Sequence, residues 1–282
     1  MVKGPLAAVQ QHGPVVGFVA AVLLLWEGAV RLFAIPKYLL PAPSMIAAAL
    51  REALPVLLKV HTPVTLSEAG LGLLMALAAG LITGTVVHAF AWARRTVYPL
   101  LVVSQTVPVI VLAPLLIIWF GYGLLPKLLV VTIACYFPIT VAVVDGLDGA
   151  DRGMLKLLRS MGAGPWQQFV MVKVPAAMGN LFTGLRVAAT YAVMSAVIAE
   201  WMGADAGLGV YIVRSANSFR TEHVFAGIVL VTLYSIGLFL LVGMARRRWL
   251  PWELHLRDGA GTVGSTPLLE TNSKTTKGVD AA

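Results

Sequence analysis

Long apolar runs separated by short polar segments fill most of the chain between residues 15 and 244. A helix needs about 20 mainly apolar residues to cross the hydrocarbon layer of a bilayer. Six runs reach about this length, and they cover residues 15–35, 64–91, 97–120, 124–144, 181–202 and 224–244. The pattern therefore predicts six transmembrane helices joined by loops, in an all-α integral membrane protein.

The first run resembles a secretory signal peptide in one respect, because Lys3 precedes it. No small-residue cleavage site follows, and the run continues into Trp26, Glu27 and Arg31. We interpret it as an uncleaved membrane helix. Glu27 and Arg31 are four residues apart, so they share a helix face and are expected to pair.

Composition supports the membrane assignment. Of the 282 residues, 59% are hydrophobic and only 12% are charged, whereas a soluble domain carries about 25% charged residues. A soluble protein this apolar would expose large patches and aggregate. The composition argues against a cytosolic enzyme, a disordered protein and a disulfide scaffold. The single cysteine, Cys135, lies in an apolar run, where we expect a small buried hydrophobic residue.

The 21 basic residues outnumber the 13 acidic ones. Such an excess can indicate nucleic-acid binding, but basic cytoplasmic loops explain it better in a membrane protein. With both termini in the cytoplasm, 14 basic residues fall on the cytoplasmic side and 7 outside, and the cluster Arg246–Arg248 directly follows the last run. We predict a multi-pass protein of the plasma or inner membrane, with both termini cytoplasmic, in contact with lipid and not with nucleic acid.

The chain divides into three parts. Residues 1–61 hold the first span and an external loop, residues 62–250 hold the other five spans, and residues 251–282 are rich in Gly, Ser and Thr. A segment with so few aromatic residues cannot build a core, so we predict a disordered cytoplasmic tail.

The loop at residues 145–180 is too polar to span a membrane and too apolar to be a plain linker. Met154, Leu155, Leu158 and Met161 recur at helical spacing. Gly162 is expected to end this helix, because glycine adopts positive φ without strain.

A second short helix is predicted to begin at Gly164-Pro165. It places Trp166, Phe169 and Val170 on one face, and Pro175 is expected to end it before the fifth span. Two interpretations of this apolar loop remain open. It could lie on lipid as an interfacial helix, or it could fill a groove on a partner protein.

The segment RSMGAGPWQQFVMVKVPAA (159–177) resembles the cytoplasmic loop signature of ABC importer permeases of the binding-protein-dependent type. Gly162 matches the signature glycine and Val174-Pro175 match its end, while Lys156-Leu157-Leu158 stand in place of Glu-Ala-Ala. The resemblance implies a coupling loop at residues 145–180 that docks on an ATPase. The implied docking residues are Met154, Leu155, Leu158, Arg159, Met161, Gly162, Ala163, Pro165, Trp166, Phe169 and Pro175.

Further segments are similar to permeases of the nitrate, sulfonate and taurine type: residues 107–123, 135–147 and 206–212. The resemblance covers about residues 62–250. It implies the type I importer permease fold (MetI-like), a homodimer of this chain, a cytoplasmic ATPase dimer and an extracytoplasmic substrate-binding protein. ATP and Mg²⁺ would be bound by the ATPase subunits, and this chain would need no cofactor.

Three segments give a hint of the solute. The stretches SMGAGPWQQF, AEWMGADAGLG and RSANSFRTEHVFA resemble permeases for thiamine-precursor pyrimidines, with riboflavin-type relatives close by. Permeases for nitrate, sulfonate or taurine remain the alternative.

Glu200 lies within the fifth span, and an ionisable residue there is a candidate for the translocation path. Tyr191 and Met194 are candidates on the same helix. Glu200 could instead reach the outer headgroups or bond a neighbouring helix. Pro108, Pro114 and Pro138 interrupt two spans, which fits either bending helices along a path or simple packing geometry.

Other polar and small residues suggest structural roles. Glu68, Asp145 and Asp148 lie near the ends of spans and are expected at the membrane interface. Ala76, Gly80 and Gly84 form a small-residue ridge suited to close helix packing.

The chain contains no GxxxxGK[ST] phosphate loop, and its five histidines are scattered. Two other classes were weighed against the permease. An ion-coupled secondary transporter would need no ATPase-docking loop, and a membrane enzyme would need paired catalytic groups at one depth. We predict a transport subunit and not an enzyme.

Overall fold

The computed structural model describes the backbone of residues 5–251 and the side chains of residues 13–251. Within this part all regular secondary structure is helical. Its elements are α1 (Pro5–Leu32), α2 (Pro43–Val56), the π-helical turn η1 (Leu57–His61), α3 (Thr62–Ala89), α4 (Ala91–Ser104), α5 (Val109–Phe120), α6 (Leu124–Asp148), α7 (Arg152–Ser160), α8 (Pro165–Gln168), the π-helical turn η2 (Phe169–Lys173), α9 (Val174–Glu200), α10 (Leu208–Asn217) and α11 (Thr221–Trp249). The predicted tail lies outside the described residues, apart from Pro251.

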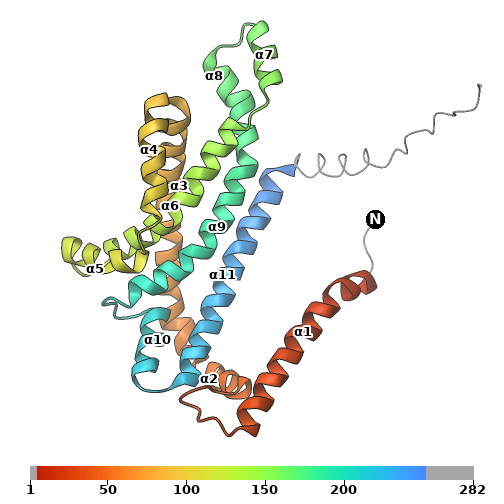
Figure 1. The fold of residues 1–282 in the computed structure, drawn as a ribbon. Coiled ribbons are helices and arrows are strands. Elements are labelled where there is room, and N and C mark those ends of the chain that lie inside the picture. The colour runs from red at the N-terminus through yellow and green to blue at the C-terminus, as the bar shows by residue number, and fades with distance from the viewer. Residues whose placement is uncertain (1–4, 252–282) are drawn as a thin grey trace, which may run out of the picture.

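Four long helices, α3, α6, α9 and α11, run side by side and share the main core. Figure 1 shows α7 and α8 together beyond one end of this bundle, and α2 and α10 at the other. We name these the α7 end and the α10 end. Helix α1 stands apart from the bundle, and only 6% of its apolar window is buried. It therefore presents its sides to lipid or to another chain.

Five of the described helical segments are long and apolar enough to cross a membrane, and the bent pair α4–α5 makes a sixth span if it is counted as one. The predicted span over residues 97–120 is sharply broken, because α4 and α5 meet at an angle of 100°. Pro108 has no N–H and disfavours helix at the residue before it. The Ser104 and Thr106 hydroxyls donate hydrogen bonds to the carbonyls of Leu101 and Val103. These two carbonyls therefore have hydrogen-bond partners where the helix is broken. Pro114 and Pro138 lie inside continuous helices.

The small-residue ridge on α3 is the seam against α6, as predicted. A Cβ at Gly80 would come within 2.7 Å of the Ile139 side chain, and one at Gly84 within 2.7 Å of Val143. The two backbones can approach this closely only because these positions lack side chains. Cys135 is fully buried in the same core.

Pro175 does not end the second loop helix, contrary to prediction. The chain stays helical from Pro165 to Glu200. In an ordinary α-helix the Pro175 ring would collide with the carbonyl of residue 171. Here the turn before it widens, and the Val174 N–H bonds the Phe169 carbonyl five residues back. The same device occurs at η1, two residues before Pro63, where the Thr62 N–H bonds the Leu57 carbonyl. A π turn thus lets a helix continue past a proline.

The expected external loop before α3 contains α2, which runs through η1 into α3. The predicted pair of Glu27 and Arg31 is present, with 2.6 Å between Arg31 Nε and Glu27 Oε1. Glu27 also accepts hydrogen bonds from the backbone N–H and the hydroxyl of Ser44. These contacts join the end of α1 to the start of α2.

Candidate functional site

The segment α7–α8 forms a hairpin with several exposed apolar side chains, whereas Leu155 and Leu158 are half-buried. Met161 and Trp166 are each 74% exposed, and Met154 and Leu157 are also exposed. Helix α7 has no buried residue. Trp166 stacks on Phe169, with 5.8 Å between ring centroids. The hairpin therefore presents an apolar ridge that nothing in the described part of the chain covers.

The turn between the two helices is tightly defined. Gly162 has a φ of +85°, which confirms the predicted positive φ. The Gly162 and Ala163 N–H groups bond the carbonyls of Arg159 and Leu158. At the start of α7, the Asp151 carboxylate accepts a hydrogen bond of 2.7 Å from the Gly153 N–H. Both ends of α7 are thus capped, which fixes its direction.

Gln168 holds the hairpin from inside, and the sequence analysis missed it. Its amide nitrogen donates to the Ala163 carbonyl at 2.8 Å, and its oxygen accepts from Arg159 Nε at 3.1 Å. Gln168 is only 7% exposed. The sequence did carry a signal for it, since Gln168 is a polar residue next to the apolar positions of a short predicted helix.

A group of charged side chains, which we call the brace, ties the base of the hairpin to the α3–α4 corner. Asp148 Oδ1 lies 2.6 Å from His88 Nδ1, and Asp148 Oδ2 lies 2.7 Å from Arg94 Nη2. Lys173 Nζ lies 2.8 Å from His88 Nε2. Because an ammonium group only donates, His88 Nε2 accepts from it and Nδ1 donates to Asp148. The brace connects α3, α4, α6 and η2.

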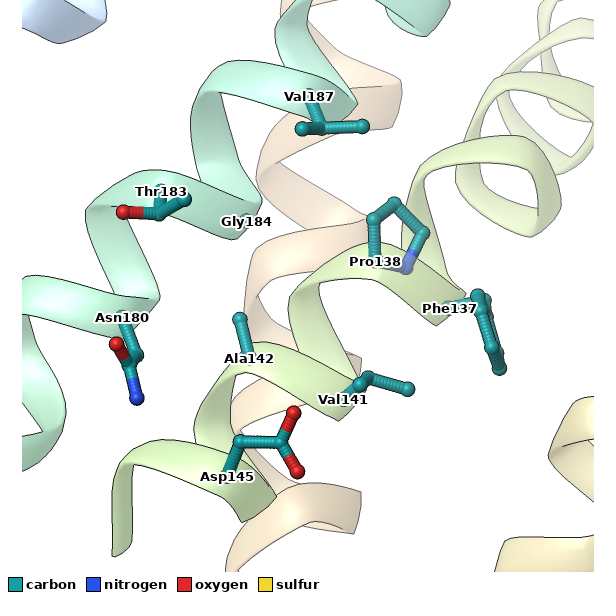
Figure 2. Close-up of a pocket in the computed structure, with 9 residues that line it drawn as sticks. All are labelled: Phe137, Pro138, Val141, Ala142, Asp145, Asn180, Thr183, Gly184 and Val187. Carbon is teal, nitrogen blue, oxygen red and sulfur yellow. The ribbon is translucent and has the colours of Figure 1, made fainter. Parts of the chain in front are cut away.

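A pocket opens between α6 and α9 close to the α7 end. Its volume is about 300 Å³. Figure 2 looks onto it, with Asp145 and Asn180 near one end and Val187 and Pro138 near the other. The residues that line it are Phe137, Pro138, Val141, Ala142, Asp145, Asn180, Thr183, Gly184 and Val187.

The exposed face of α9 continues beyond this pocket. It begins with Asn180 and Thr183 and extends through Val187 to Tyr191 and Met194, which are 49% and 57% exposed. A second hollow of about 450 Å³ lies between this helix and α11, and Met194 and Thr190 belong to its lining. One face of α9 thus carries polar and aromatic groups over about four helical turns.

Glu200 lies at the far end of α9 and is 1% exposed. One carboxylate oxygen accepts from the Thr65 hydroxyl at 2.5 Å, and the other from the Gly209 N–H at 2.5 Å. The Leu208 N–H bonds the Thr65 hydroxyl, and the Gly207 N–H bonds His61 Nδ1. We call this group the clamp, because it ties the start of α10 to α3 and α9.

The glycines of the segment AGLG are explained by the clamp. A Cβ at Gly207, whose φ is +134°, would collide with the Glu200 carboxylate, and one at Gly209 would collide with the Val197 carbonyl. The carboxylate also lies at the N-terminus of α10, where a negative charge is favourable.

A second polar group lies at the corner of α10 and α11. His223 stands between the Arg220 guanidinium and the Tyr211 hydroxyl. A guanidinium only donates, so His223 Nε2 accepts and Nδ1 donates to Tyr211 Oη over 2.7 Å. Burial raises the pKa of the Tyr211 phenol, which keeps it neutral in this contact.

The family of binding-protein-dependent transport system inner membrane components matches residues 72–250 of this chain. The chain belongs to this family. It is the permease subunit of an ABC importer, a multi-pass inner-membrane protein and a transport subunit rather than an enzyme. Such permeases work with an ATPase and a substrate-binding protein.

The permease is similar to the formylaminopyrimidine transport permease ThiX of Halalkalibacterium halodurans, with 36% identity across 84% of this chain and 94% of that protein. It is 33% identical to the riboflavin transport system permease RibX of Chloroflexus aurantiacus, across 85% of this chain and 91% of the relative. The taurine permease TauC of Escherichia coli is 28% identical, across 84% and 89%.

Among solved structures, the permease resembles a chain of the inward-facing MetNI methionine ABC transporter with a TM-score of 0.56. The identity is 20%, and the match covers 68% of this chain and 97% of that one. This likeness confirms the type I importer permease fold.

The structure separates the predicted path residues of the permease. Tyr191 and Met194 share the exposed face of α9, whereas Glu200 is nine residues, or about 2.5 turns, from Tyr191 and points to the other side. Pro108 is exposed at the start of α5, and Pro114 is half-buried within it. Helix α5 packs against Ala199, near the α10 end of α9.

Glu68, predicted near the membrane interface, is buried within the protein. It is 1% exposed, and Lys127 Nζ lies 2.7 Å from its Oε1. The reason is that Glu68 lies on the face of α3 that packs on α6, opposite the first turn of that helix. Asp145 and Asp148, for which the same position was predicted, are exposed at the α7 end.

Proposed function

We propose that two copies of this permease form the translocation path of an importer, with both termini in the cytoplasm and the α7 end facing an ATPase dimer. A binding protein would deliver the solute at the α10 end. ATP and Mg²⁺ would be held by the ATPase subunits, and their closure would move the α7–α8 hairpins.

The exposed apolar ridge of the hairpin is the observation that carries this proposal. Four large apolar side chains, Met154, Leu157, Met161 and Trp166, are 49–74% exposed. A ridge of this kind on a rigid hairpin suits a groove on a folded partner. The internal bonds of Gln168 and the cap at Asp151 favour this interpretation over a helix that lies loosely on lipid, because they fix a shape.

The exposed face of α9 supports a second copy. Asn180, Thr183 and Thr190 lie on that face, and polar side chains at membrane depth are expected to face protein or a water-lined path. A homodimer with this face toward its centre satisfies that requirement. Tyr191 and Met194 would then line the path, and the broken span at Pro108 and the half-buried Pro114 would lie beside it.

The solute we propose is a pyrimidine precursor of thiamine. The support is the similarity to the formylaminopyrimidine permease at 36% identity. Riboflavin, sulfonate or taurine is the alternative, because permeases for these solutes are also similar to this chain.

Reconstitution tests the proposal. The permease, its ATPase and its binding protein are placed in proteoliposomes, and uptake of labelled formylaminopyrimidine is measured with and without ATP. Trp166→Ala should abolish ATPase co-purification and uptake. Trp249→Ala is the control, since Trp249 is 66% exposed at the same end of the bundle but outside the hairpin. Uptake without ATP, or normal ATPase binding by Trp166→Ala, would overturn the coupling role.

A further inference from the structure

We propose that the pocket between α6 and α9 binds the imported solute on its way to the cytoplasm. The proposal assigns it a planar, neutral or cationic heterocycle with an amino group, and it rests on the proposed function as a permease. The argument comes from the unpaired polar groups of the pocket, its charge and its size.

Asp145 is the central group. It lies in the last turn of α6, where the helix dipole disfavours a negative charge. Asp148, one turn later, is compensated by His88 and Arg94. The exposed Asp145 carboxylate has no ion pair or hydrogen bond within residues 13–251, although the Asp145 backbone carbonyl accepts from the Gly149 N–H. An uncompensated carboxylate that lines a pocket is suited to a ligand with N–H donors.

Asn180 supplies the second polar contact. Figure 2 places Asn180 on the neighbouring helix at the same end of the pocket as Asp145, whose carboxylate is directed toward the Val141 side. The exposed side-chain amide of Asn180 has no hydrogen bond in the described part of the chain, so both amide donors and the amide acceptor are open to a ligand. Thr183 is different, because its hydroxyl already donates to the Gly179 carbonyl and accepts from Arg246 Nη1.

The remaining lining is apolar. Phe137, Pro138, Val141 and Val187 surround the space between the polar end and the far end. The two helices approach each other closely at Gly184, since a Cβ there would collide with the Pro138 carbonyl and with Ala142. One polar end and apolar walls fit a flat ring with polar substituents on one edge.

Charge and size narrow the ligand further. Asp145 is the only charged residue among the described lining residues, so the pocket is expected to repel sulfonates and other anions. Arg246 donates to the hydroxyl of the lining residue Thr183 at 3.2 Å and is not itself a lining residue. A volume of about 300 Å³ is at the lower end of the range for small-ligand sites, which suits one small heterocycle.

Equilibrium binding tests the assignment separately from transport. The purified full chain, in complex with its ATPase and without nucleotide or binding protein, is titrated with labelled formylaminopyrimidine. Wild type should bind it saturably, and taurine should not compete. Asp145→Asn should weaken binding about tenfold or more, because it removes the charged acceptor. Asn180→Ala should weaken it by a smaller factor.

The control is Asp205→Asn, which removes the same charge from the exposed turn before α10. It should bind like wild type. Three results would each overturn the pocket assignment. They are absence of saturable binding to wild type, binding as tight as that of wild type by both the Asp145→Asn and the Asn180→Ala variants, and competition by taurine. If the protein binds the ligand normally and through Asp145 but shows no ATP-driven uptake, the proposed function is refuted while the assignment of the pocket as a binding site is retained.

Discussion

The two ends of the bundle treat polar and apolar side chains in opposite ways. At the α10 end, Glu68 and Glu200 are each 1% exposed, and both are bonded within the chain. At the α7 end, Met161 and Trp166 are 74% exposed, and the charged brace lies behind them.

This difference indicates at which end the side chains find their partners within a single chain. Buried polar groups stabilise a structure only when their partners are in place, and the α10 end supplies partners from within the chain to Glu200 and to Glu68 Oε1, while Glu68 Oε2 and Glu222 Oε2 are buried without a hydrogen bond among the described residues. Exposed apolar groups gain free energy only when something covers them, so the α7 end is left for a partner to finish. The predictions below test this contrast, starting with the largest expected effect.

Lys127→Met should cause the largest loss of stability. It would leave the Glu68 carboxylate buried without its cation, which costs about 3–5 kcal/mol. The free energy of unfolding, measured by titration with a denaturing detergent, should fall by this amount. Replacing both Glu68 and Lys127 by Met should recover most of the loss, and a single variant as stable as wild type would contradict the buried pair.

Glu200→Ala should follow, because the Gly209 N–H and the Thr65 hydroxyl lose their acceptor. We expect a loss of about 2–3 kcal/mol. Glu52→Gln is the control, since the Glu52 side chain is 73% exposed.

The milder Glu200→Gln variant separates the clamp from a path role. If the uptake kinetics of this variant equal those of wild type, the role of Glu200 is limited to holding the clamp together. Altered kinetics in a protein with wild-type stability and ATPase assembly would support a place in the path.

Gly162→Val should act on assembly rather than on the bundle. A β-branched residue at a φ of +85° costs about 1–3 kcal/mol of local strain. A Cβ there would meet no atom within 4 Å, so the effect is conformational and not a collision. We expect normal membrane abundance, reduced ATPase co-purification and lost uptake.

Gly164→Val is the matched control for that variant. Gly164 has a φ of −69°, which any residue adopts, and open space around it. It should retain ATPase binding. Equal behaviour of the two variants would refute the role of the Gly162 turn.

Asp148→Asn should have the smallest effect on stability, about 1 kcal/mol or less, because the brace is partly solvated. Its effect should appear in coupling. With the hairpin base less firmly joined to the α3–α4 corner, fewer solute molecules should be transported per ATP hydrolysed. The control is Asp205→Asn, which should leave the number of solute molecules transported per ATP unchanged. If Asp148→Asn leaves this number unchanged as well, the brace has only a structural role.

The sequence predicted those features that depend on local pattern. Apolar runs located the spans, and spacing with Gly162 and Pro165 located the hairpin and its turn. The small residues of α3 predicted its packing seam. Each of these follows from positions a few residues apart.

Features that depend on distant partners were missed. The burial of Glu68 was not predicted, because its partner Lys127 is 59 residues away in the sequence. Helix α2 and helix α10 are short and were assigned to loops. Pro175 was expected to stop a helix, because no sequence signal announces a π turn. The pocket at Asp145 and Asn180 required the packing of α6 on α9.

The unbroken helical path from Pro165 to Glu200 gives the permease a mechanical element. Its 36 residues span roughly 54 Å at about 1.5 Å per residue, well beyond the roughly 30 Å of a bilayer core. Under the proposed function it would act as a lever, with the hairpin at one end and the clamp at the other. A tilt of about 5° about the clamp would displace the hairpin by about 5 Å. The π turn at Phe169–Lys173 is the place where such a lever would flex first.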